Sequence, residues 1–157
     1  LMVEDHLMQV VLNLVLNAVD AMPGGGVLRL EVTSAGHEVA LRVHDSGCGM
    51  DRTVLGRCFE PLFTTKAPGQ GTGLGLSISR DILEEAGGRL ELHSAVGHGT
   101  TAVVSLPAAI RRLKNICCSR SVIGPPGSAA SGSEVVAIVE SRSSVGHRRF
   151  SARSSVP

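Results

Sequence analysis

The chain has 157 residues, which suits one domain with a short tail. It carries 15 basic against 14 acidic residues, so its net charge of +1 gives no indication of nucleic-acid binding. Hydrophobic residues make up 43% of the chain, but there is no Trp or Tyr and only three Phe. A core must therefore be built from Leu, Val, Ile and Ala.

The cysteines and the hydropathy indicate a compartment. The cysteines lack the paired C-x-x-C spacing of zinc sites, and free thiols fit a reducing setting; they are Cys48, Cys58, Cys117 and Cys118. No apolar run reaches the roughly 18–20 residues that cross a bilayer, and acidic residues stand where a signal peptide is basic. We therefore expect a cytoplasmic domain, and a membrane anchor elsewhere in a longer protein is compatible with it.

The first part of the chain has two clear periodicities. Apolar residues between Leu7 and Met22 recur at spacings of three and four, which predicts an amphipathic helix that ends at Pro23. Alternating apolar and polar residues over 28–33 and over 39–43 predict two half-buried strands. The short turn between these strands predicts a hairpin.

The next part alternates between regular and irregular segments. A short helix is predicted over 51–58, and an irregular loop with Pro, Gly, Thr and Lys over 60–72. A second long helix is predicted over 74–86, followed by strands over 89–94 and 100–106. The expected fold class is α/β, a two-layer sandwich whose mixed, mostly antiparallel sheet is covered on one face by about three helices.

The composition changes after Pro107. The following residues are rich in Ser, Arg, Gly and Pro and have no pattern that builds a core. We therefore expect a domain over 1–108 and a low-complexity, disordered tail over 109–157. Within this tail, the apolar run from Glu134 to Glu140 could form one buried strand.

Two asparagines on the first helix are candidate ligands. Asn13 and Asn17 lie four residues apart, so they project from one face of the helix and border its apolar stripe. Asn is a mediocre helix former, and two in an apolar helix carry a cost. One interpretation is a pair of surface amides. The other is a pair of aligned oxygens that suits a hydrated cation such as magnesium.

Asp45 follows a predicted strand and precedes Gly47 and Gly49. In one interpretation its carboxylate bonds its own downstream backbone in an Asx-turn. In the other it accepts a hydrogen bond from an exocyclic amine, while the two glycines let a flat ring pack on bare backbone. The D-x-G-x-G spacing alone does not decide between them.

The segment Gly71-Thr72-Gly73-Leu74-Gly75-Leu76 opens the second long helix. Backbone N–H groups at a helix start favour a phosphate, although a GxGxG string also occurs in plain turns. The segment has neither the P-loop spacing nor the leading strand of a dinucleotide fingerprint. Lys66, in the loop before it, is either a solvated surface lysine or a phosphate contact.

Five segments in a fixed order carry a family resemblance. They closely resemble the N, G1, F, G2 and G3 boxes of the histidine kinase ATP-binding domain, which has the Bergerat fold. Its superfamily also holds gyrase, MutL and a heat-shock chaperone. The resemblance covers residues 2–107 and rests on Asn13-Leu-Val-Leu-Asn17-Ala, Asp45-Ser-Gly-Cys-Gly49, Phe59-Glu-Pro-Leu-Phe63-Thr-Thr-Lys66, Gly71-Thr-Gly-Leu-Gly75-Leu and Gly97-His-Gly-Thr100.

The resemblance implies a bound ATP with Mg²⁺ and a role for each matching residue. Asn17 would coordinate the magnesium that bridges the phosphates, with Asn13 beside it, and Asp45 would accept a hydrogen bond from the adenine amino group. Thr100 would support the adenine end through hydroxyl or water contacts. Lys66 and the loop from it to Gly71 would form the ATP lid. Further positions lining the base or holding phosphate would be Gly47, Gly49, Gly71, Thr72, Gly73, Leu74, Gly75 and Leu76, while Phe59 and Phe63 would pack the base of the lid.

The residue one turn before Asn17 distinguishes the members of this superfamily that hydrolyse ATP from those that transfer its phosphoryl group to a histidine. Members that hydrolyse ATP place a Glu there as general base, whereas Asn13 is an amide that cannot take a proton. Transfer to an imidazole, itself a nucleophile, needs mainly positioning and charge neutralisation. The resemblance therefore implies a protein histidine kinase. A nucleotide-binding regulatory module without turnover and a gyrase- or MutL-type ATPase are the alternatives.

In this family the phosphoacceptor histidine lies on a dimerising helical hairpin before the ATP-binding domain. None of the six histidines stands in such a motif, and the strand expected before the first helix is missing. We therefore expect an N-terminally truncated chain that binds ATP but is inactive alone. Its expected partners are the missing dimerisation domain and the receiver domain of a response regulator, in a homodimeric full-length protein. Residues 134–140 faintly resemble the opening strand of such a receiver domain, and the tail could be its remnant.

Overall fold

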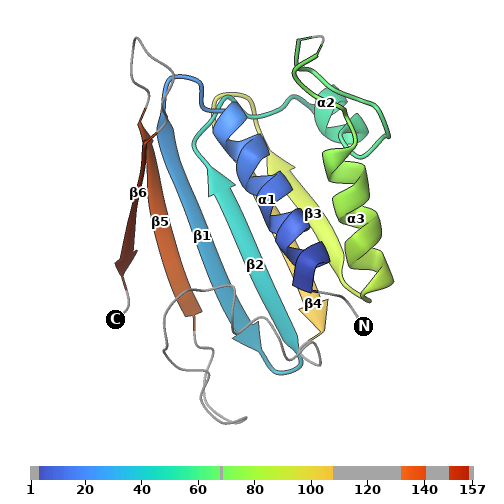
Figure 1. Ribbon diagram of the computed structural model, residues 1–157, viewed down its shortest axis with the longest axis vertical. Helices are drawn as coiled ribbons and strands as arrows, with labels where there is room; N and C mark the ends of the chain where they lie inside the picture. Colours follow the sequence, from blue (N-terminus) through green and yellow to red (C-terminus); the bar gives the residue numbers. More distant parts are fainter. Residues whose placement is uncertain (1–3, 68, 108–131, 141–148, 156–157) are drawn as a thin grey trace.

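The computed structural model describes residues 4–67, 69–107, 132–140 and 149–155 (Figure 1). None of the helices formed by these residues is long and apolar enough to cross a membrane. In chain order the elements are α1 (Glu4–Asp20), β1 (Gly26–Ala35), β2 (Glu38–Asp45), α2 (Arg52–Arg57), α3 (Gly75–Glu85), β3 (Arg89–Ser94), β4 (Thr100–Pro107), β5 (Gly132–Glu140) and β6 (Arg149–Ser155).

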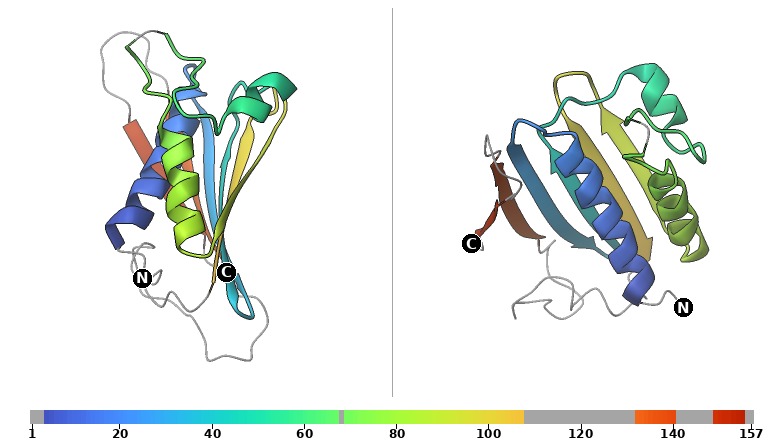
Figure 2. Two further views of the ribbon diagram at one scale, coloured as in Figure 1. Left: turned by 90° about the vertical axis from the view of Figure 1, so that its right-hand side faces the viewer. Right: turned by 45° about the horizontal axis from the view of Figure 1, so that its top comes forward.

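The strands form one sheet in the order β3-β4-β2-β1-β5-β6, and each neighbouring pair is antiparallel. Helices α1 and α3 lie side by side on one face of this sheet, as the edge-on view shows (Figure 2). Helix α2 lies at the end of the sheet, and none of its residues is buried. The predicted α/β two-layer sandwich is confirmed, with two of its helices forming the covering layer.

The core lies between the sheet and the two long helices. Leu7, Val10 and Leu14 of α1 are buried at the three- and four-residue spacing that defined the helix. Leu83 of α3 and Leu28 of β1 are among the most deeply buried side chains. Leu, Val, Ala and Met make up the buried core cluster, as expected for a chain with only three aromatic residues.

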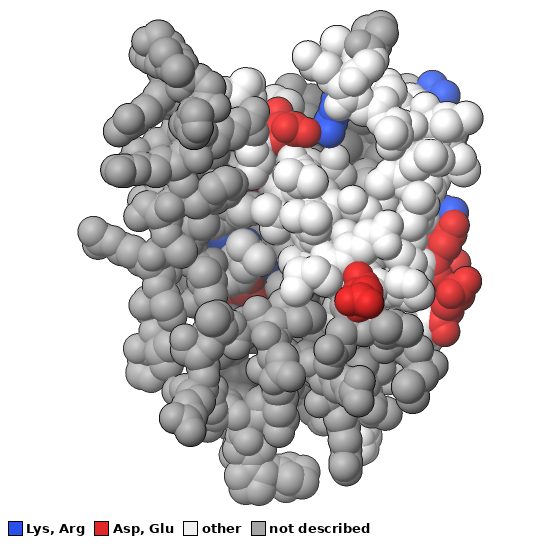
Figure 3. Space-filling view, in the orientation of Figure 1, with Lys and Arg blue, Asp and Glu red and all other residues white. Residues whose placement is uncertain are grey.

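The outward face of α1 is also apolar. Met8, Leu12 and Leu16 recur every four residues and are each about half exposed, at 51%, 54% and 51%. In the view onto the two helices, charged side chains are confined to a few small groups around an uncharged surface (Figure 3). The helix is therefore less amphipathic than a surface helix of a small domain usually is.

The tail differs from the expectation of disorder in two segments. Residues 132–140 form β5, which pairs with β1, and residues 149–155 form β6 beside it. An open strand edge such as that of β1 presents unpaired N–H and C=O groups, which any extended segment can pair without a side-chain pattern. The run from Glu134 to Glu140 is thus a strand. The other tail residues lie outside the described part, and the division at residue 108 stays a prediction.

Candidate functional site

Asp45 ends β2 and is 4% exposed, opposite Thr100 on β4. Its Oδ1 accepts hydrogen bonds from the backbone N–H groups of Gly47, at 2.8 Å, and of Thr100, at 3.3 Å. The bond from Gly47 is that of an Asx-turn. Among the described residues both bonds fall on Oδ1, so Oδ2 is available to a ligand. The two interpretations of Asp45 are therefore compatible: Oδ1 forms the Asx-turn, and Oδ2 can accept a hydrogen bond from a ligand.

Burial raises the pKa of the Asp45 carboxyl above its ordinary value of 3.8. The hydrogen bonds from Gly47 and Thr100 and the charge of His44 lower this pKa, but by less than burial raises it. His44 is itself fixed by Thr101, whose hydroxyl lies 2.9 Å from its Nδ1. The fold thus holds an acceptor in a poorly solvated place, where a hydrogen bond from a ligand is strong.

The glycines after Asp45 are required by packing within the protein. Gly49 has φ +66, and a Cβ there would run into the carbonyl of Ala95. A Cβ on Gly47 would lie 2.6 Å from the carbonyl oxygen of Ala21. These contacts account for both glycines without a ligand. Their predicted role in lining a base therefore stays a prediction.

Ser94 is a residue of this end that the sequence did not reveal. Its hydroxyl accepts from the N–H of Met50 at 2.8 Å, donates to the carbonyl of Gly99 at 2.9 Å, and lies 2.9 Å from the Thr100 hydroxyl. Thr100 therefore reaches Asp45 through its backbone N–H, while its hydroxyl is engaged by Ser94. Ser94 lies opposite Thr100 in the β3–β4 pairing. This pairing becomes known only from the register of the two strands, so the sequence alone could not identify Ser94.

The start of α3 forms the second end of the site. The N-terminus of α3 has no side-chain cap, so it retains unpaired donors that favour an anion. The hydroxyl of Thr72 accepts from the N–H of Leu74 at 3.4 Å and shapes the approach to the helix. Gly73 has φ +66, and a Cβ there would overlap the backbone of Leu62. The segment is thus held against the backbone of Leu62.

Asn13 connects the two long helices. Its side-chain amide donates to the carbonyl of Gly75 at 3.3 Å and to the hydroxyl of Ser79 at 3.2 Å. Ser79 is fully buried and lies on α3, so this contact joins α1 to the first turns of that helix. Asn13 is thus placed beside the predicted phosphate segment, with its amide nitrogen engaged by protein.

Replacing Ser79 with Ala is expected to lower the free energy of unfolding by about 1 kcal/mol, because one acceptor of the Asn13 amide is lost. Urea unfolding measures this change. Ser77→Ala is the matched control: its buried hydroxyl donates to Leu74 within the same helix, and its removal should cost less than about 0.5 kcal/mol. Equal losses in the two variants would contradict a stabilising role for the contact between the helices.

Lys66 crosses from the lid to the end of α1. Its Nζ lies 2.8 Å from Oδ2 of Asp20 and 3.3 Å from Oδ1 of Asn17. The sequence indicated Asn17 and Lys66, but neither their contact nor Asp20. Among the described residues there is no group of three or more His, Cys, Asp and Glu side chains that could hold a metal. The oxygens of Asn17 and Asp20, which share one cationic partner, are the donor set that suits Mg²⁺ here.

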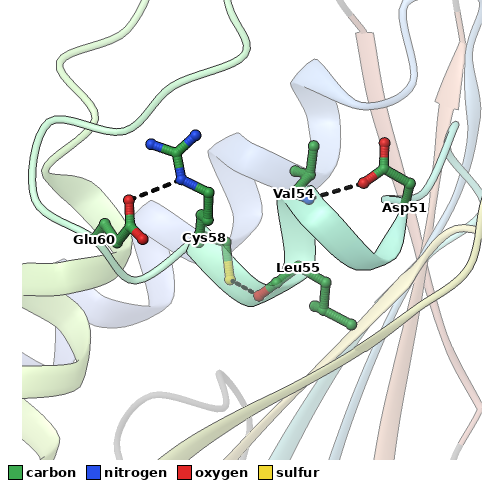
Figure 4. A network of polar contacts seen from close by, with 6 residues as sticks. Asp51, Val54, Leu55, Cys58 and Glu60 are labelled. Atoms are coloured by element: carbon green, nitrogen blue, oxygen red, sulfur yellow. Dashed lines mark hydrogen bonds and ion pairs between the residues drawn. The ribbon is translucent and has the colours of Figure 1, made fainter.

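The base of the lid is packed by protein. Phe59 packs against the core, and the Arg57 guanidinium lies 4.4 Å from the Phe63 ring centroid. Asp51 caps the start of α2 by accepting from the N–H of Val54 at 2.8 Å, and the exposed Arg57–Glu60 ion pair lies at the other end of this helix (Figure 4). The two phenylalanines therefore support the lid.

The two ends of the site lie at one end of the sandwich. The last turn of α1, the end of β2 and the start of α3 all point to the upper end in Figure 1. A separate open cavity of about 490 Å³ lies at the other end of β2, beside Glu38 and Arg89, and contains none of the predicted site residues. The predicted residues of the first helix, the Asp45 loop and the second long helix are thus gathered at a single location.

Known proteins share this arrangement over the first two thirds of the chain. The family described as histidine kinase-, DNA gyrase B-, and HSP90-like ATPase matches residues 2–110. The two-component sensor PprA of Pseudomonas aeruginosa is 46% identical over 112 residues, which are 67% of this chain and 12% of PprA. The sensor histidine kinase ZraS of Escherichia coli K12 is 43% identical over 108 residues, 69% of this chain and 23% of ZraS. The chain thus spans less than a quarter of either relative.

Solved structures agree with this result. The catalytic domain of histidine kinase ThkA superposes with a TM-score of 0.58 and 31% identity, over 66% of this chain and 68% of that chain. Full-length ShkA in complex with AMPPNP superposes with a TM-score of 0.55 and 32% identity, over 65% of this chain and 21% of that chain. The sequence resemblance is confirmed, and the chain belongs to the histidine kinase-, DNA gyrase B-, and HSP90-like ATPase family.

Proposed function

We propose that this chain is the ATP-binding catalytic domain of a two-component sensor histidine kinase. It transfers the γ-phosphoryl group of ATP to a histidine on a dimerisation domain, from which the group passes to an aspartate of a response regulator. The observation that carries this proposal is Asn13, which stands where a hydrolytic member needs a general base and whose amide is bonded to α3. The relatives named as sensor kinases, PprA and ZraS, support it.

The adenine binds at Asp45. Oδ2 accepts a hydrogen bond from the exocyclic amine, while the bonds from Gly47 and Thr100 hold the carboxylate in place. Guanine carries an oxygen at the corresponding position, which would face the carboxylate with a second acceptor. The site therefore discriminates in favour of ATP, because a buried acceptor left without a donor is costly.

The phosphates bind at the other end. The turn from Gly73 into the uncapped start of α3 at Gly75 and Leu76 offers backbone N–H groups, and Lys66 offers a positive charge from the lid. Asn17 would hold Mg²⁺, and the bound metal would neutralise charge on the phosphates. The residues of this chain then orient the γ-phosphoryl group, and the attacking imidazole comes from another segment. Full-length ShkA, whose solved structure is a complex with AMPPNP, supports nucleotide binding as the function of this domain.

The partners follow from the chemistry. A histidine on a dimerisation domain accepts the phosphoryl group, a receiver domain takes it up, and the whole protein acts as a homodimer. None of the six histidines lies in a phosphoacceptor motif, so the 157-residue chain is proposed to be inactive alone. The relatives are sensor kinases several times longer than the matched region, which leaves room for such partner domains and for a membrane anchor.

A transfer experiment tests the function. The chain is mixed with a separately expressed dimerisation hairpin of a similar sensor kinase and with ATP labelled at the γ-phosphate. Label should appear on the hairpin as an acid-labile, base-stable phosphohistidine. Binding of ATP without labelled histidine would favour the regulatory module. Steady phosphate release by the chain alone, abolished in Asn17→Ala, would favour the ATPase.

Asn17→Ala is expected to remove most of the increase in ATP affinity that Mg²⁺ gives, about tenfold or more, because the amide oxygen is the proposed ligand. Calorimetric titration with ATP, in Mg²⁺ and in EDTA, measures this difference. ATP affinity in EDTA should change little. An equal loss in both conditions would mean that Asn17 shapes the pocket and does not hold the metal.

A further inference from the structure

The ammonium group of Lys66 lies between two oxygens at the end of α1. Oδ2 of Asp20 is 2.8 Å from Nζ, and Oδ1 of Asn17 is 3.3 Å from it. Lys66 comes from the lid, 46 residues after Asp20 in the chain. The side chains of Lys66 and Asp20 are 33% and 43% exposed, so a small ion from solvent can reach the place that the ammonium holds.

The charge distribution at the end of α1 favours a bound cation. Asp20 is the last residue of the helix, where the dipole disfavours a carboxylate, and no basic residue lies in the last turn. Asn17 and Asp20 are three residues apart, so their oxygens face the same side of the helix. This end therefore combines a formal negative charge, an amide oxygen and the negative pole of the helix around one cationic group.

We propose that Asp20 is a second magnesium ligand group beside Asn17, and that Lys66 occupies this place when no metal is bound. The proposal rests on the proposed nucleotide function, which supplies the metal. A carboxylate beside an amide oxygen is a stronger magnesium site than the amide alone, since Mg²⁺ is held in proteins mainly by carboxylates and phosphates. Asp20 thus extends the predicted metal site from one residue to two.

Exchange of the two cations connects the metal to the lid. The ammonium of Lys66 would leave the oxygens of Asn17 and Asp20 if these held Mg²⁺, and it would then be available to the phosphates. The Lys66 stem lies against Gly71, since a Cβ built on Gly71 would be 3.0 Å from Lys66 Cδ. Lys66 thus lies beside the backbone that leads into α3, so its release would connect the metal to this part of the lid.

The substitution Asp20→Asn separates this role from a structural one. Without metal, Asp20 repels the triphosphate and retains Lys66, so the variant should bind ATP in EDTA up to about fivefold more tightly than the wild type. With Mg²⁺, the increase in ATP affinity should fall about tenfold, because the charged ligand is lost. A residue that only shapes the fold would move both affinities in one direction.

The experiment uses calorimetry with ATP, in Mg²⁺ and in EDTA, and Mn²⁺ as a spectroscopic probe of the metal site in the presence of AMPPNP. Glu38→Gln is the matched control, because it removes the exposed carboxylate of the Glu38–Arg89 ion pair, which lies at the other end of β2 and outside the site. Asp20→Glu should recover most of the magnesium effect. Weaker Mn²⁺ binding in Asp20→Asn, with Mn²⁺ binding unchanged in Glu38→Gln, supports the proposal.

Two results would contradict the inference, and only one of them would also contradict the proposed function. If the wild type binds ATP and the magnesium effect in Asp20→Asn equals that of the wild type, the assignment of Asp20 is wrong and the proposed function stands. If the wild type binds no ATP in either condition, the proposed function and this inference both fall.

Discussion

Replacing Asp45 with Asn is expected to lower ATP affinity about tenfold to hundredfold, because a hydrogen bond to a charged, buried acceptor is lost. An Asn side chain can still accept the bonds from Gly47 and Thr100 through its oxygen. Its amide nitrogen then stands where Oδ2 stood and meets the adenine amine with a second donor. The same substitution is expected to leave the free energy of unfolding unchanged or to increase it.

The stability part follows from the direction of the Asp45 pKa. Burial raises the pKa of this carboxyl in the folded chain above its value in the unfolded chain. The folded state therefore binds more protons between these two pKa values, and stability falls as the pH rises through this window. Above it, the ionised carboxylate is a cost that a neutral Asn does not carry. The ionised Asp45 carboxylate is thus needed for binding but lowers the free energy of unfolding.

The pH dependence of binding provides a second measurement. As the pH falls through the raised pKa, Asp45 is protonated and loses its acceptor character, so ATP affinity of the wild type should decrease. This decrease should begin at a higher pH than the ordinary Asp value of 3.8 would give. In Asp45→Asn the Asp45 contribution to this pH dependence should disappear. Calorimetry over a pH series and urea unfolding at each pH measure both quantities.

Asp51→Asn is the control for this experiment. Asp51 is an exposed N-cap of α2, and Asn caps a helix as well as Asp does, so neither ATP affinity nor stability should change. Unchanged ATP affinity in Asp45→Asn would show that the adenine does not bind at Asp45. A large loss of stability in that variant would show that its binding defect comes from the fold.

Periodic patterns made most of the fold predictable. The stripe that includes Leu7, Val10 and Leu14 is buried as expected, and the alternating residues of β1 and β2 form the predicted hairpin. The strands β5 and β6 were less accessible to sequence analysis. Pairing with the open edge of β1 uses backbone groups alone, and such pairing leaves little pattern in the sequence.

The site was predictable where residues are close in sequence and not where they meet by folding. The Asx-turn of Asp45 is local, so its spacing to Gly47 indicated it. The contacts of Asn13 with Ser79 and of Lys66 with Asp20 join residues 66 and 46 positions apart. A hydroxyl or a carboxylate on a helix is usually a solvated group, and only the packing of α1 beside α3 and the lid gives these side chains their partners.

Gly73→Ala is expected to have the other large effect. Gly73 has φ +66, which costs a non-glycine residue about 1–2 kcal/mol. A Cβ there would also overlap the backbone of Leu62, which has φ +67 and has little freedom to move. The lid and the start of α3 must separate to admit the methyl group. We expect a loss of at least about 2 kcal/mol in the free energy of unfolding and at least about tenfold in ATP affinity, because the phosphate donors are displaced.

Gly69→Ala separates the two causes. Gly69 lies in the same loop and has φ +84, but a Cβ built there meets nothing within 4 Å among the described residues. This variant should show only the conformational cost of about 1–2 kcal/mol and near-normal ATP affinity. Urea unfolding and calorimetry with ATP and Mg²⁺ compare the two variants directly. If both variants lost ATP affinity equally, the flexibility of the lid would determine ATP binding. Loss of affinity in Gly73→Ala alone would show that the close contact between Gly73 and Leu62 positions the phosphate-binding turn.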